Sequence, residues 1–94
     1  MSLQITTDSM IIFVVAENDE SPYLKIYLKD GKNKEMTQKR IEKLPFADRR
    51  FIVMRGTGKE PYWVIRNFSK YFADFPEFKE AGTLLKNQPK LFQD

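Results

Sequence analysis

The sequence contains no cysteine and no histidine. Without cysteine, the chain can form neither disulfides nor thiolate metal sites. Without histidine, it lacks the commonest general base and the commonest zinc ligand. No apolar run approaches the roughly 18 residues that a membrane-spanning helix needs, and residues 1–9 lack the basic stretch that opens a secretory signal. We therefore expect a cytoplasmic protein with no metal, no other cofactor and no membrane partner.

A catalyst built from this sequence would have to use carboxylates, lysines, tyrosines or serines. None of the serines lies in a nucleophile-elbow pattern; they are Ser2, Ser9, Ser21 and Ser69. The acidic residues are scattered along the chain, with no D-x-D pair to hold a metal. We therefore predict that the protein is not an enzyme.

Positive charge is concentrated in the middle of the chain. Residues 1–20 carry four acidic side chains and no basic one, whereas residues 21–60 carry eleven Lys and Arg against five Asp and Glu. The net charge of the whole chain is only +3. A clustered basic segment is typical of a protein with a polyanionic partner, although a solvated surface of a small domain can have the same charge pattern.

The apolar pattern predicts an α+β fold in one small domain over residues 1–94, with 1–9 and 88–94 frayed. Residues 10–16 are an unbroken apolar run that we expect to be the central strand. Residues 23–29 alternate perfectly and predict a second, half-buried strand. Residues 35–44 predict a helix with Met36, Ile41 and Leu44 on its apolar stripe and Asn33 as its cap.

Two further strands are predicted over 51–54 and 62–65, followed by helical segments that break near Asp74 and restart. The element order is β-β-α-β-β-α-α. The fold is a mainly antiparallel sheet of four strands, or five if residues 3–6 form an edge strand, with helices packed on one face.

The best candidate for a binding surface is the outward side of the 23–29 strand. If Leu24, Ile26 and Leu28 face the core, the tyrosines and lysines between them face the solvent. Exposed aromatic rings can stack on nucleic-acid bases, and neighbouring lysines can contact phosphates. Further cations follow in the next hairpin and its glycine-rich loop. The predicted nucleic-acid-binding residues are Tyr23, Lys25, Tyr27, Lys29, Arg49, Arg50, Arg55 and Lys59.

Aromatic residues are dense between Tyr62 and Phe78, where seven of the thirteen lie. Most of these rings are expected to fill the core. Trp63 and Tyr71 are the two that we expect at a partner interface if the core cannot hold them all, because surplus exposed rings mark partner surfaces.

Two hypotheses of function follow. The first is a non-enzymatic, nucleic-acid-associated regulatory protein that uses the basic and aromatic sheet face. The second is a small protein-interaction module, an inhibitor or adaptor of the kind found among phage and mobile-element accessory proteins. It would act through an acidic protein surface or a homodimer that buries Trp63 and Tyr71.

Overall fold

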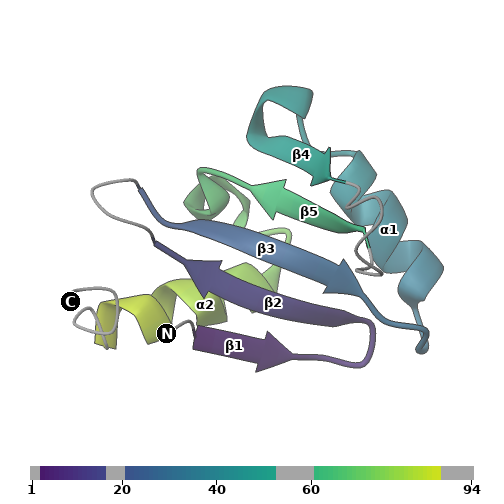
Figure 1. Ribbon diagram of the computed structural model, residues 1–94, viewed down its shortest axis with the longest axis horizontal. Coiled ribbons are helices and arrows are strands. Elements are labelled where there is room, and N and C mark those ends of the chain that lie inside the picture. The colour runs from purple at the N-terminus through teal and green to yellow at the C-terminus, as the bar shows by residue number, and fades with distance from the viewer. Residues whose placement is uncertain (1–2, 17–20, 53–60, 88–94) are drawn as a thin grey trace.

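The computed structural model describes residues 3–16, 21–52 and 61–87. The strands are β1 (Leu3–Thr6), β2 (Met10–Val15), β3 (Tyr23–Leu28), β4 (Arg49–Ile52) and β5 (Tyr62–Ile65). The helices are α1 (Lys34–Glu42) and α2 (Pro76–Asn87), with two 3₁₀ helices, η1 (Phe46–Asp48) and η2 (Phe68–Tyr71). The five strands form one antiparallel sheet in the order β1-β2-β3-β5-β4 (Figure 1). The predicted α+β fold is confirmed, and residues 3–6 supply the fifth strand.

The apolar run at 10–16 forms an interior strand, but the prediction that it is the central strand is wrong. β2 lies second in the sheet because β1 pairs along its outer side, and β3 takes the centre between β2 and β5. Burial along β2 alternates. Met10, Ile12 and Val14 are fully buried, whereas the residues between them are only half-buried. An unbroken apolar strand therefore has one face in the core and one apolar face outside it.

Two hairpin–helix units make up most of the chain. β2 and β3 lead into α1, and β4 and β5 lead into η2 and α2. The second strands of the two hairpins, β3 and β5, pair with each other at the middle of the sheet, where Leu24 is opposite Ile65 and Ile26 is opposite Trp63. Residues far apart in the sequence, such as those of β3 and β5, are thereby brought side by side.

Both helices pack on the same face of the sheet. Ile41 from α1 and Phe78 and Ala81 from α2 are fully buried in one cluster with Leu24 and Ile26. Figure 1 shows α2 passing behind β1 and β2. Full burial of each large apolar side chain stabilises the fold by about 1.5–3 kcal/mol. Neither α1 nor α2 packs on the opposite face. Within the described residues, no helix is both long and apolar enough to cross a bilayer.

The buried face of α1 is formed by different residues from those predicted. Met36 is 62% exposed, while Thr37 is buried and its hydroxyl lies 2.8 Å from that of Ser9. Thr37, Ile41 and Leu44 are spaced i, i+4 and i+7, which is the repeat of one helix face, whereas Met36 lies off that face. Asn33 occupies the cap position in a left-handed conformation, but its side chain makes no capping hydrogen bond.

The helical C-terminal part begins as a 3₁₀ turn at Phe68 and becomes an α-helix only at Pro76, so the predicted restart is confirmed. Gly82 lies in the middle of α2 because Phe72 packs directly against it. A Cβ atom at position 82 would lie 2.8 Å from the tip of the Phe72 ring. The glycine that lowers helix propensity here allows two segments to approach closely.

Candidate nucleic-acid interface

The face of the sheet opposite α1 and α2 carries every second strand residue, and we call it the open face. Its residues follow from the strand pairing: Gln4, Thr6, Ile11, Phe13, Val15, Tyr23, Lys25, Tyr27, Arg50, Ile52, Tyr62 and Val64. None of these positions in the described strands holds an Asp or Glu. The open face is therefore apolar and aromatic, with positive charge.

Three aromatic rings lie next to one another near its centre. The Tyr27 ring meets Phe13 edge-on, with 5.8 Å between centroids, and meets Tyr62 at a tilt, with 5.3 Å between centroids. The three residues come from β2, β3 and β5, so the rings cross the strands. Each side chain is half-buried. Such a row is suited to stack on flat groups, since bases bind proteins of this kind through their π-faces.

Cations are interleaved with these rings. The Lys25 ammonium lies 4.6 Å from the Tyr62 ring centroid and 5.9 Å from that of Tyr27. The Arg66 guanidinium, just after β5, lies 5.1 Å from the Tyr23 ring centroid. These separations are within the range of cation–π attraction. The rings thus hold positive charges beside their own stacking surfaces.

The structure brings together four of the predicted binding residues: Tyr23, Lys25 and Tyr27 on β3, and Arg50 on β4. Arg50 is exposed and pairs with Val64, which pairs in turn with Lys25. Lys29 lies just beyond the end of β3, where its ammonium donates a hydrogen bond to the Thr7 carbonyl at 3.3 Å. Arg55 and Lys59 lie outside the described residues.

Arg49 is not part of the open face. It pairs with Ile65, whose side chain is in the core, so it points to the helix side of the sheet. There its Nε donates a hydrogen bond to the Leu44 carbonyl at 3.0 Å, and its guanidinium lies 5.4 Å from the Trp63 ring centroid. Consecutive strand residues alternate between faces, so Arg49 and Arg50 cannot contact the same phosphate surface.

Trp63 and Tyr71 both lie in the core instead of on an exposed aromatic patch. Their residues are 8% and 9% exposed, and both belong to the hydrophobic cluster. The helix side of this small sheet has enough room for both rings. Little of either residue is therefore accessible to a partner in the described structure.

Tyr71 instead belongs to a polar clamp with Asp48, Asn67 and Lys70. The Tyr71 hydroxyl donates a 2.6 Å hydrogen bond to the Asp48 carboxylate, which also accepts one from the Asn67 amide at 3.1 Å. The Lys70 ammonium lies 3.7 Å from the same carboxylate.

The hydrogen bonds from Tyr71 and Asn67 lower the pKa of Asp48, and the charge of Lys70 lowers it further. Burial, together with the Asp48 hydrogen bond and charge, raises the pKa of Tyr71 to about 12. The clamp ties η1 to η2.

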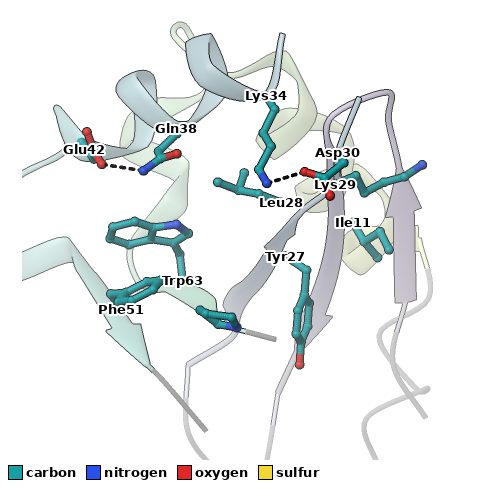
Figure 2. A pocket seen from close by; sticks show the side chains of 11 residues that line it. Ile11, Tyr27, Leu28, Lys29, Asp30, Lys34, Gln38, Glu42, Phe51 and Trp63 are labelled. Atoms are coloured by element: carbon teal, nitrogen blue, oxygen red, sulfur yellow. Dashed lines mark hydrogen bonds and ion pairs between the residues drawn. The ribbon is translucent and has the colours of Figure 1, made fainter. Parts of the chain in front are cut away.

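A cleft of about 780 Å³ adjoins the open face, between α1 and the ends of β3, β4 and β5. One wall is formed by Phe51 and Trp63, whose ring centroids are 4.6 Å apart. Figure 2 shows these two rings below the side chains of Gln38 and Glu42 on α1, with Tyr27 on the opposite side. The cleft is therefore aromatic on the sheet side and polar on the helix side.

Sequence reasoning missed three residues of this region: Phe13, Tyr62 and Arg66. The apolar run 10–16 predicts a central strand without marking Phe13 as an outward residue, and Tyr62 is predicted only as part of the strand 62–65. The pairing of β2 with β3 would have revealed Phe13, because it stands opposite Lys25. The pairing of β3 with β5 likewise places Tyr62 and Arg66 on the side that Val64 shares with Lys25.

Comparisons with family models, with curated proteins and with solved structures find no match to this chain. Within the described residues, no cluster of three or more acidic, cysteine or histidine side chains is arranged to hold a metal ion.

Proposed function

We propose that this protein is a non-enzymatic, nucleic-acid-binding regulatory protein whose open face contacts a single strand. One observation carries the proposal: a sheet face that neither α1 nor α2 covers combines adjacent aromatic rings with basic side chains and has no carboxylate at its described strand positions. Bases would stack on Phe13, Tyr27 and Tyr62, while phosphates would meet Lys25, Arg50 and Arg66. Single-strand binders combine these two kinds of contact. The proposal places the protein in the cytoplasm.

The charge of the open face favours a polyanion over a second copy of the chain. A face-to-face homodimer would bring Lys25, Arg50 and Arg66 toward the same cations of its partner. Like charges brought together across an interface cost several kcal/mol. A nucleic-acid strand supplies the opposite charge and the flat rings at once.

A protein partner remains the second candidate, because Phe46 and Met36 are large apolar side chains that are strongly exposed outside the strands of the sheet. Phe46 is 80% exposed, in the 3₁₀ turn before β4, with the Arg49 guanidinium 5.7 Å from its ring centroid. Two separate side chains offer a smaller contact surface than the open face does, so nucleic-acid binding ranks first.

The test is a matched pair of charge reversals. Lys25→Glu changes a cation on the open face, and Lys79→Glu changes an exposed cation on α2, on the other side of the sheet. Fluorescence anisotropy with a labelled single-stranded oligonucleotide should show about tenfold weaker binding for Lys25→Glu, which corresponds to one charged contact of about 1.4 kcal/mol. Lys79→Glu should bind within twofold of the wild type.

Equal losses in the two variants would show that binding depends on net charge alone and not on the open face. No binding by the wild type at low salt, to single-stranded DNA or RNA, would end the proposal. Far-ultraviolet circular dichroism of each variant verifies that the fold is kept.

A further inference from the structure

The cleft beside the open face differs from it in charge. The Lys34 ammonium is paired with the Asp30 carboxylate at 2.6 Å, and the Gln38 amide donates a hydrogen bond to the Glu42 carboxylate at 3.1 Å (Figure 2). The charged groups on the α1 side of the cleft therefore include both signs. The cleft therefore attracts a phosphate only weakly, whereas an uncharged ring with polar edges can contact both aromatic and hydrogen-bonding groups there.

The size of the cleft also suits a small planar ligand. Its volume of about 780 Å³ is within the range of about 300–1,000 Å³ that is usual for small-molecule sites. Phe51, which is 47% exposed, presents its ring on one wall and is backed by Trp63. A ring so supported is positioned to stack with little loss of conformational freedom.

The cleft and the open face are continuous. Tyr27 and Ile11 belong to the open face by strand pairing, and both also line the cleft. A strand lying across the rings of Tyr62 and Tyr27 would thus reach the mouth of the cleft without crossing another element of the described sheet.

We propose that one base of the bound strand leaves the open face and enters this cleft, where it stacks on Phe51 and directs its polar edge toward Gln38 and Glu42. The inference rests on the proposed function and adds to it a pocket for a single nucleobase. Glu42 carries a carboxylate, which only accepts hydrogen bonds. The base edge that fits it best therefore presents N–H donors.

Trp63 makes the inference testable, because it is the only tryptophan in the chain and lies in the wall of the cleft. A labelled single-stranded oligonucleotide is titrated with protein by anisotropy, and the same strand without label is added to the protein while Trp63 emission is recorded. Both signals should change with the same midpoint. A strand of abasic deoxyribose phosphates, which keeps the charges and lacks the bases, should leave Trp63 emission unchanged.

Phe51→Ala is the test variant, and Met36→Ala is its control, since Met36 is exposed on α1 and lines neither the cleft nor the open face. Phe51→Ala should weaken oligonucleotide binding about tenfold, the size expected for one stacked base, while Met36→Ala should bind within twofold of the wild type. Binding by anisotropy with no change in Trp63 emission and no effect of Phe51→Ala would overturn the base pocket and leave the open-face proposal standing. No anisotropy change at all would overturn both.

Discussion

Replacing Tyr27 and Tyr62 together with alanine should lower the affinity for a single-stranded oligonucleotide about 100-fold. Each ring that stacks on a base contributes about 1–3 kcal/mol, and two losses of about 1.4 kcal/mol multiply to this factor. The two rings are 5.3 Å apart between centroids, and Lys25 lies beside both. Their removal therefore also takes away the aromatic support of that cation. Anisotropy titrations of the double variant and the wild type give the ratio.

The control is Met36→Ala, which removes an exposed apolar side chain from α1, on the other side of the sheet from the open face. This control should bind within threefold of the wild type. An unchanged affinity in the folded Tyr27 and Tyr62 variant would mean that the rings of the open face do not contact the strand.

The second large effect concerns stability at alkaline pH. The pKa of Tyr71 is about 12 in the folded protein and about 10 when unfolded. Between pH 10 and pH 12 the unfolded chain therefore binds fewer protons than the folded one, so the free energy of unfolding falls as pH rises through this window. The loss attributable to Tyr71 is on the order of 2–3 kcal/mol. At the acid end, the lowered pKa of Asp48 acts in the opposite sense, and its stabilising contribution is lost as pH falls from the ordinary pKa of an aspartate through the lowered folded pKa.

Tyr71→Phe should remove this alkaline dependence and cost about 2 kcal/mol at neutral pH, the value of a hydrogen bond to a charged group. Tyr27→Phe is the matched control, because it deletes the same atom from a half-buried ring on the open face and should change stability by less than about 0.5 kcal/mol. Urea unfolding at pH 7, 10 and 11.5 gives all the values. If wild type and Tyr71→Phe lose stability in parallel above pH 10, the clamp does not hold the tyrosine proton.

Local alternation was enough to predict which way the residues of β3 point. Leu24 and Ile26 are fully buried, and Tyr23, Lys25 and Tyr27 lie on the opposite side. The same period-2 rule separates Arg49 from Arg50, but that separation becomes evident only when the strand is known to begin at Arg49. The pattern of a single strand is thus a local property, whereas its exact limits depend on its partner.

The features that sequence reasoning missed depend on pairing between distant segments. Phe13 joins the open face because β2 meets β3 in one register, and a shift of one residue would have turned it inward. Trp63 is buried because the helices cover the inward side of β5. The cleft combines residues from α1, β3, β4 and β5, which no local pattern connects.

The most direct test of the open face as a nucleic-acid surface is the salt dependence of binding. Lys25, Arg50 and Arg66 together would neutralise about three phosphates, and each contact with a single strand contributes about −0.7 to the slope of log affinity against log salt concentration. Anisotropy titrations of the wild type in roughly 50 to 300 mM potassium chloride should therefore give a slope of about −2. A slope near zero would contradict the account, because a surface without ionic contacts releases no counterions.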